Sequence, residues 1–229
     1  MIFIFQNLRD SLTRKADPLA NPDLNAQETA GMSYPAASLA LTYDDYLEWE
    51  NHQPDRHEYI GGEVFAMSGT SDRHNEISLN LATLLRQHLR GTPCRVYMID
   101  VKARVEAADC CFYPDVQVTC AESDLTDRYA KRSPLLVVEV LSESTATFDL
   151  GQKFAAYQQL DSLREYVLVD QERIRVQIFR RREGRWWVDN IGPGGRLRLE
   201  SVDLDCPIEA LYEDLSAPIP AEPPVPAAR

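Results

Sequence analysis

One apolar stretch near the middle of the chain limits the folds that this sequence can adopt. Residues 135–141 read Leu-Leu-Val-Val-Glu-Val-Leu, so the stretch is apolar apart from one glutamate and shows no alternation with polar residues. A strand that is apolar on both faces belongs in the centre of a sheet that is covered on both sides. Helical patterns precede and follow this strand, which predicts an α/β sandwich around a mixed sheet.

The segments around this strand predict the order helix, three strands, helix, strand. A helix is expected over residues 71–90, because apolar side chains recur there at helical spacing. The later elements are expected as strands at 95–105, 112–120 and 135–141, a helix that starts at Asp149, and a strand at 166–169. Glycine-containing turns at residues 61–62 and 183–184 predict two small flanking hairpins.

Length and composition predict one folded domain with tails, or at most two small domains. The chain has 229 residues and a formal net charge of −12, which argues against a uniformly basic DNA-coating surface. We expect the domain at residues 41–212, a poorly ordered tail at 1–40 and a proline-rich tail at 213–229. No apolar run approaches the roughly 18 residues of a membrane span, so no membrane partner is expected.

Basic residues gather in one segment of this acidic chain. Eight arginines lie between residues 171 and 198, among them Arg173 and Arg175. Such a segment is a candidate contact strip for a polyanion. The alternative is an ordinary solvated strand face, and the sequence alone leaves both open.

The cysteines give no sign of a metal or disulfide framework. The chain has 5 of them, an odd number, and none forms a Cys-x-x-Cys pair. This pattern argues against a zinc ribbon and a disulfide scaffold. The simplest expectation is a cytoplasmic protein with reduced cysteines.

Two carboxylates stand out against their surroundings. Glu139 interrupts the apolar strand, and Asp115 follows Pro114 at the start of the preceding strand. Two carboxylates about 4 Å apart repel by about 4 kcal/mol at an effective dielectric near 20. A divalent cation would turn that repulsion into coordination, and oxygen ligands with open positions suit Mg²⁺. The alternative is that Asp115 caps a strand and Glu139 pairs with an arginine.

Three further residues are candidates for the same site. Lys153 shares a helix face with the apolar residues that should meet the sheet, so its ammonium needs an anionic neighbour such as Glu139. Glu63 follows a glycine turn and could bring another carboxylate. His74 lies on the apolar stripe of the first helix. The alternatives are a snorkelling lysine, an exposed hairpin glutamate and a hydrogen-bonded core histidine.

Several motifs together resemble a known family. Residues 59–63, 113–116, 137–142, 149–157 and 163–170, with His74, are similar in order and spacing to the Uma-two family of putative restriction endonucleases. The resemblance covers roughly residues 40–182. The family is similar to the PD-(D/E)xK nucleases, whose restriction-endonuclease-like core has αβββαβ topology. This topology agrees with the element order expected above.

The resemblance implies roles for the candidate residues. Pro114-Asp115 would be the PD element and Glu139 the second acid. The lysine expected two residues later is replaced by Leu141, and Lys153 on the following helix would take its place. Gly62 also departs from the Asp that is common in the family, although Glu63 remains.

The implied activity is hydrolysis of DNA by an endonuclease that uses Mg²⁺, with Mn²⁺ as a substitute. Asp115, Glu139 and Lys153, with Glu63, would be catalytic, and His74, Arg173 and Arg175 would contact the substrate. Double-strand cleavage would suit a homodimer. The rivals are a non-catalytic module with a nuclease fold that binds nucleic acid or a protein, a hydrolase of another phosphate ester, and a structural protein with ion-paired acids.

Overall fold

The computed structural model describes residues 41–67, 69–142, 145–217 and 219. The described residues fall into two compact units, residues 41–67 in the first and the described residues from 69 onward in the second. The predicted tail at 1–40 lies outside the described residues, and so does much of the predicted tail at 213–229. Of the described helices, none is both long and apolar enough to cross a membrane.

The first unit contains a short helix and a hairpin. Its elements are α1 (Tyr43–Glu50), β1 (His57–Ile60) and β2 (Glu63–Ala66). Thr42 and Asp45 form a capping box that starts the helix. Gly61 and Gly62 have φ angles of 55° and 92°, which residues with a Cβ rarely adopt, so the predicted glycine turn is confirmed.

The second unit carries the remaining elements. Its helical segments are α2 (Asp72–His88), η2 (Glu106–Ala108), α3 (Glu122–Thr126), α4 (Ala146–Phe148), the π-helical turn η3 (Asp149–Lys153), α5 (Phe154–Tyr157) and η4 (Ile208–Leu211). Its strands are β3 (Arg95–Met98), β4 (Lys102–Val105), β5 (Cys110–Phe112), β6 (Val116–Thr119), β7 (Ala130–Lys131), β8 (Leu136–Leu141), β9 (Glu165–Asp170), β10 (Val176–Arg182), β11 (Arg185–Ile191), β12 (Arg196–Leu199) and β13 (Leu204–Pro207).

A six-stranded mixed sheet is the centre of this unit. Its strand order is β11-β10-β9-β8-β6-β3, and β8 pairs with β9 in parallel while the other neighbours are antiparallel. The helical segment from α4 to α5 crosses from β8 to β9. With α2 before the strands, this gives the expected αβββαβ order. The predicted mixed α/β fold is therefore confirmed.

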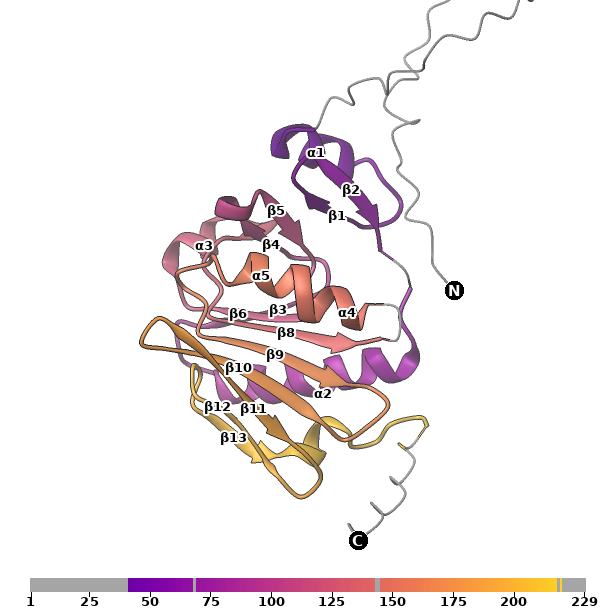
Figure 1. Ribbon diagram of the computed structural model, residues 1–229, viewed down its shortest axis with the longest axis vertical. Coiled ribbons are helices and arrows are strands. Elements are labelled where there is room, and N and C mark those ends of the chain that lie inside the picture. Colours follow the sequence, from indigo (N-terminus) through magenta and orange to yellow (C-terminus); the bar gives the residue numbers. More distant parts are fainter. Residues whose placement is uncertain (1–40, 68, 143–144, 218, 220–229) are drawn as a thin grey trace, which may run out of the picture. The chain divides into compact units, whose positions relative to one another are not determined.

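Helices cover both faces of the sheet. Figure 1 shows α2 behind the sheet and the segment from α4 to α5 in front of it. The α2 face is apolar, because Ile77, Leu81 and Leu85 pack against valines of the central strands, such as Val116 and Val138. As predicted, β8 is buried on both faces. Glu139 and Val137 lie on its other face, toward α5.

Two predicted elements differ from the structure. The strand expected at residues 95–105 is two strands, β3 and β4, separated by a turn in which Ile99 has a φ of 36°. No glycine or proline marks this break in the sequence. The helix expected to start at Asp149 begins at Ala146, so Asp149 lies inside the helical segment instead of capping it.

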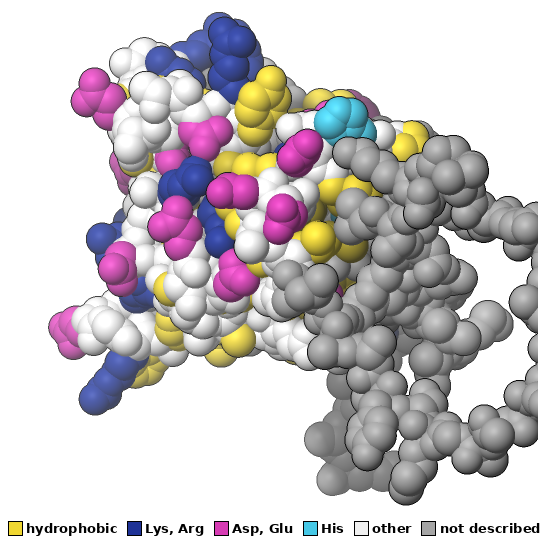
Figure 2. Space-filling view, turned by 90° about the horizontal axis from the view of Figure 1, so that it is seen from above, with side chains coloured by type: hydrophobic (Ala, Val, Ile, Leu, Met, Phe, Trp, Pro, Cys, Tyr) yellow, Lys and Arg dark blue, Asp and Glu magenta, His cyan; other side chains and the backbone are white. Residues whose placement is uncertain are grey.

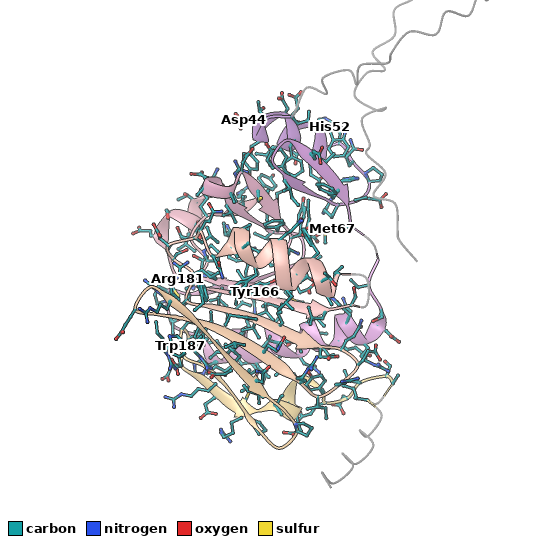
Figure 3. The ribbon with its side chains drawn as sticks, viewed as in Figure 1. Asp44, His52, Met67, Tyr166, Arg181 and Trp187 are labelled. Atoms are coloured by element: carbon teal, nitrogen blue, oxygen red, sulfur yellow. A yellow bond between two sulfur atoms is a disulfide. The ribbon has the colours of Figure 1, made fainter. Side chains whose placement is uncertain are left out.

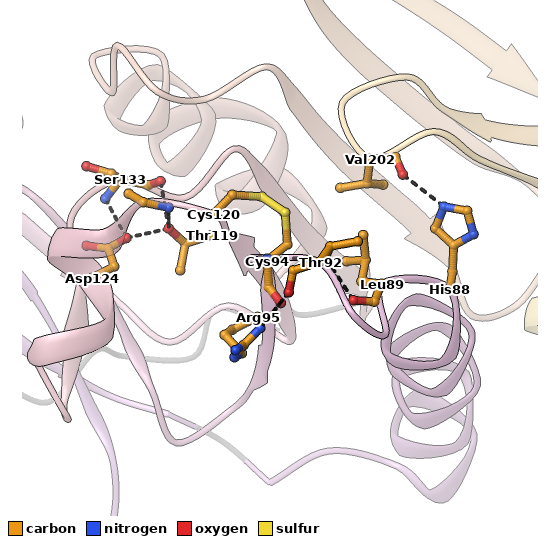
Figure 4. Close-up of a disulfide and its surroundings, with 11 residues drawn as sticks. His88, Leu89, Thr92, Cys94, Arg95, Thr119, Cys120, Asp124, Ser133 and Val202 are labelled. Atoms are coloured by element: carbon orange, nitrogen blue, oxygen red, sulfur yellow. Dashed lines mark hydrogen bonds between the residues drawn. A yellow bond between two sulfur atoms is a disulfide. The ribbon is translucent and has the colours of Figure 1, made fainter.

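The expectation of reduced cysteines is wrong for one pair. A disulfide joins Cys94 and Cys120, next to the paired residues Arg95 and Thr119 of β3 and β6 (Figure 4). Antiparallel pairing places the two cysteines opposite each other, although 26 residues separate them in the chain. Their spacing alone could not reveal this contact.

Candidate active site

Asp115 lies one residue before β6, at the end of the sheet. The pairing of Val116 with Val138, extended by one residue, places Asp115 opposite Glu139 on the neighbouring strand. Its carboxylate accepts a hydrogen bond from the backbone N–H of Val140, with 2.7 Å from nitrogen to Oδ2. The side chain is therefore held across the strand that carries the second acid.

Glu139 is the buried carboxylate of β8. Only 3% of its surface is exposed. The Lys153 ammonium lies 3.1 Å from its Oε1, and the Tyr157 hydroxyl donates to the same oxygen at 3.4 Å. An ionised carboxylate at this depth needs such partners, because an unpaired one would cost several kcal/mol.

Lys153 reaches the sheet from the π-helical turn η3. Its Nζ lies 3.6 Å from Oδ1 of Asp149, four residues earlier, and 5.5 Å from the centre of the Phe112 ring. Both Lys153 and Asp149 are almost completely buried. The ammonium thus lies between two carboxylates. Its contact with Glu139 is the one expected from the sequence, and Asp149 is an additional member of the cluster.

Asp149 and Tyr157 were not identified from the sequence. In the sequence, Asp149 has the pattern of a helix cap and Tyr157 lies on the apolar face of the helix. A π-helical turn inserts one extra residue into a helix and often occurs at functional sites. The i, i+4 spacing of Asp149 and Lys153 was the signal available in the sequence.

His74 contacts the first acid. Its Nε2 lies 3.2 Å from Oδ2 of Asp115, and the side chain is buried. The Ser71 hydroxyl accepts from the His74 backbone N–H and so caps α2. The Nδ1 atom of His74 has no hydrogen-bond partner in the described part of the chain. The helix start therefore places an imidazole against the carboxylate.

The loop between β9 and β10 carries Arg173 and Arg175. The Arg175 guanidinium pairs with Asp170 at 3.1 Å, and about half of its side chain is exposed. The start of α2 packs on the same loop, because Ser71 donates to Gln171 at 2.8 Å. Arginine side chains therefore lie near the end of the sheet at which the parallel strands β8 and β9 finish.

Tyr212 holds this loop in place. Its hydroxyl accepts from the backbone N–H of Arg175 at 3.2 Å and donates to the carbonyl of Asp170 at 3.0 Å. Burial raises the pKa of Tyr212 well above its ordinary value. The phenol therefore stays neutral at any pH near neutrality and can keep donating.

Four further arginines of the basic segment form internal contacts. Arg180 pairs with Glu165 at 2.8 Å, Arg182 with Glu200 at 2.6 Å, and Arg196 with Asp205 at 2.7 Å. Arg181 stacks on the Trp186 ring at 4.8 Å. On the face shown in Figure 2, acidic and basic side chains are interspersed. The contacts favour a structural role for these four arginines over a continuous polyanion strip.

Glu63 belongs to the first unit. It is exposed at the start of β2, directly after the glycine turn. Its role in the site stays a prediction.

The cluster presents oxygen donors that suit a hard cation. Both contacts of Asp115 use Oδ2, which leaves Oδ1 without a hydrogen bond to the described residues. Carboxylate oxygens of this kind fit Mg²⁺, which usually keeps several water ligands. Within the described ranges, no three His, Cys, Asp or Glu side chains are arranged as a complete metal site.

A family model and two relatives match most of the chain. A family model named Uma2, described as "Putative restriction endonuclease", matches residues 43–208. The chain is 35% identical over 177 residues to the uncharacterised protein slr1290 of Synechocystis, a match that covers 77% of this chain and 93% of the relative. A second uncharacterised Synechocystis protein, sll1609, is 34% identical over 155 residues, with 67% and 88% covered.

The fold is similar to that of a solved structure. The crystal structure of a putative nuclease of DUF820 from Anabaena variabilis matches with a TM-score of 0.62. The match covers 75% of this chain and 97% of that chain at 16% sequence identity. At this identity the likeness shows the fold alone.

Proposed function

The chain belongs to the Uma2 family of putative restriction endonucleases, and from that premise we propose that it is a metal-dependent endonuclease that hydrolyses phosphodiester bonds in DNA. The family and the fold support a nuclease. The metal, the substrate and the roles of individual residues are part of the proposal. It assigns the charged cluster to the PD-(D/E)xK type of site, with the lysine moved from the strand to the helix.

One observation carries this proposal. The Lys153 ammonium lies 3.1 Å from Glu139, and Asp115 is bonded to the residue that follows Glu139. Three groups that are distant in the sequence thus converge at one end of the sheet. A protein that needed only stability would gain little from burying these charges, because apolar residues of similar size often serve as well.

Asp115 and Glu139 would hold Mg²⁺ or Mn²⁺ together with the carbonyl of Val140. When bound, such an ion polarises the scissile phosphate and lowers the pKa of a bound water. Asp115 offers its free Oδ1, and its Oδ2 is fixed by the Val140 N–H and by His74. His74 is therefore proposed to position Asp115, and its predicted contact with the substrate becomes secondary.

Lys153 would act on the attacking water and on the charge that develops at phosphorus. A positioned ammonium can orient a water molecule and stabilise a developing oxyanion. Asp149 and Glu139 hold the Lys153 Nζ at 3.6 Å and 3.1 Å and so fix its position. The assignment of Glu63 to the catalytic residues stays a prediction.

Arg173 and Arg175 would bind the DNA backbone. Each contact between an arginine and a phosphate releases counterions, so binding should weaken as salt rises. The loop that carries them is fixed by Tyr212 and Ser71. Such contacts orient the duplex without reading its sequence.

One observation favours a second function. Lys153 already neutralises Glu139, and no described group of three metal-ligating side chains is present. A nuclease fold that has lost catalysis and binds nucleic acid or a protein would show the same features. Affinity for Mn²⁺ distinguishes the two, since a retained site binds the ion and a lost one does not.

A nicking assay tests the proposal. Purified protein is incubated with supercoiled DNA, with and without Mg²⁺ or Mn²⁺, and with single-stranded DNA and RNA as further substrates. The wild type should nick DNA only with metal, and Asp115→Ala should be inactive. Asp161→Asn, an exposed acid outside the cluster, is the matched control and should keep full activity. Equal activity of Asp115→Ala and the wild type would reject the proposal.

A further inference from the structure

Strand β11 forms one border of the six-stranded sheet and is open to solvent. Five of its seven residues are exposed, including Trp187 at 57% and Val188 at 49%. Figure 3 labels Trp187 on this outer strand and Tyr166 within the sheet. Two neighbouring exposed hydrophobic residues on a border strand are uncommon, because such edges invite pairing with another chain.

The backbone pattern shows which groups of β11 point outward. Glu183 and Gly184 have φ angles of 51° and 74°, as in a two-residue type I′ turn, so Arg182 and Arg185 form a hydrogen-bonded pair. Hydrogen-bonded and non-hydrogen-bonded residue pairs alternate along two antiparallel strands. Residues 185, 187, 189 and 191 therefore bond to β10, and residues 186, 188 and 190 direct their N–H and C=O groups to the open side.

The other pairing of β10 supports this assignment. The Arg181 N–H donates to the Arg164 carbonyl on the side of β9. Odd-numbered residues of β10 thus face β9 and even-numbered residues face β11, as the turn requires. Among the described residues, no backbone bond outside the regular ladders uses residues 186, 188 or 190.

The opposite border of the sheet is protected. Strand β3 has only four residues and follows Pro93. A short strand next to a proline offers little to a partner. By contrast, β11 pairs with β10 through seven consecutive residues without a bulge or a proline.

The side chains of β11 complement a second copy of the same strand. In an antiparallel pair with a two-fold axis at Trp187, the two Trp187 rings meet, and Arg185 of each copy lies opposite Asp189 of the other. Opposite charges and aromatic pairs across strands are both stabilising. An axis at Asp189 would place two like charges opposite each other, and an axis at Val188 would leave Arg185 opposite Ile191.

The two charged residues are placed for this contact. Asp189 already bonds to Arg180, and about half of its side chain is still exposed. Arg185 is exposed and has no ion pair within the described residues. We propose that two copies of this chain associate through β11, with Trp187 on the two-fold axis, to form one continuous antiparallel sheet. The proposal does not depend on nuclease activity.

The first test is the oligomeric state of the full chain, measured by analytical ultracentrifugation over a concentration series. The wild type should form a dimer as concentration rises. Val188→Pro removes one outward N–H and leaves the bonds to β10 intact, so the dissociation constant should rise at least tenfold. Val188→Thr keeps that N–H and the branched shape, and should dimerise like the wild type.

The second test fixes the register and does not require a proline. Opposite residues of a non-hydrogen-bonded pair are close, so Trp187→Cys should form a covalent dimer under mild oxidation. The yield of covalent dimer from Val188→Cys should not exceed that from the wild type. The wild-type yield measures the background from the other cysteines. A cross-link at Val188→Cys alone would overturn the Trp187 axis. A protein that stays monomeric at all concentrations would overturn the proposal. Slow amide exchange at Val188 in that monomer would show that a segment of the same chain covers the outer edge of β11.

Discussion

The face of the six-stranded sheet that packs on α2 buries aliphatic side chains, whereas the face toward α4 and α5 buries charged groups. Val116 and Val138 lie on the first face, with Leu81 of α2 packed against the strands. Asp115 and Glu139, one residue away on the same two strands, lie on the second. Alternation along a strand thus separates the two environments by a single residue.

The difference indicates what each face contributes. Burying aliphatic groups stabilises the fold by about 25 cal/mol per Å² of apolar surface. Burying Glu139, Lys153 and Asp149 gains little after desolvation, although breaking the cluster is costly. We therefore expect changes on the α2 face to alter stability, and changes on the α5 face to alter activity first.

The largest effect should come from Glu139→Gln on the charged face. The amide keeps the size of the side chain but loses the charge that would bind metal. Activity per folded molecule should fall about 10³-fold, equivalent to about 4 kcal/mol. The nicking rate of supercoiled DNA at saturating Mg²⁺ measures this loss.

Glu122→Gln changes an exposed acid of the same type and should leave the rate unchanged. A Glu139→Gln protein that nicks as fast as the wild type would show that the charged face has no catalytic role.

The next effect should come from Leu81→Ala on the aliphatic face. Leu81 is completely buried between α2 and the sheet. Its truncation should lower the free energy of unfolding by about 3 kcal/mol, through lost burial and a residual cavity. Urea denaturation measures the change, and the rate per folded molecule should not change. If Leu81→Ala also lowered the nicking rate per folded molecule, the two faces would not differ in what they contribute.

A smaller effect should appear as coupling between Lys153 and Glu139. Lys153→Met removes the ammonium that contacts Glu139 and Asp149, and Glu139→Gln removes one carboxylate that contacts Lys153. The double variant should be more stable than the sum of the single losses predicts, by about 2 kcal/mol. A urea denaturation cycle of the four proteins measures this energy. Additive losses would contradict the ion pair.

The smallest effect concerns Tyr212 and alkaline pH. Burial raises its pKa in the folded state, so the unfolded chain loses the proton first, near pH 10. The contribution of the neutral phenol to stability is complete below that pH and is lost as pH rises further. Tyr212→Phe should cost about 1 kcal/mol at neutral pH through lost hydrogen bonds.

The difference in unfolding free energy between the wild type and Tyr212→Phe should become smaller above about pH 10, where the tyrosine of the unfolded chain ionises. Unfolding free energies of both proteins between neutral and alkaline pH measure it. A gap that stays constant across this range would contradict a raised pKa for Tyr212.

Some parts of the site could be predicted from the sequence because they violate local patterns. Glu139 interrupts an apolar run, and Lys153 shares a helix face with apolar residues. Burying a charged side chain without a partner is costly, so two such residues of opposite charge are predicted to contact each other. The contact of Lys153 with Glu139 agrees with this reasoning.

Other parts depend on contacts that local patterns do not encode. Asp149 resembles a helix cap in the sequence, and the earlier start of the helix at Ala146 places it inside the helix, where it faces Lys153. Cys94 and Cys120 meet because β3 and β6 are neighbours, a matter of topology. The break at Ile99 lacks glycine or proline and so gives no signal.

The parallel crossover from β8 through the helix to β9 has a consequence for how the protein is made. Glu139 and Tyr157 are 18 residues apart, and Asp115 is 25 residues from Val140, so the cluster joins groups from separate elements of the chain. The helical segment also contacts β9, because the Tyr166 hydroxyl donates to the carbonyl of Asp149 at 2.9 Å. A chain emerging from the ribosome therefore cannot complete these contacts before β9 has been synthesised.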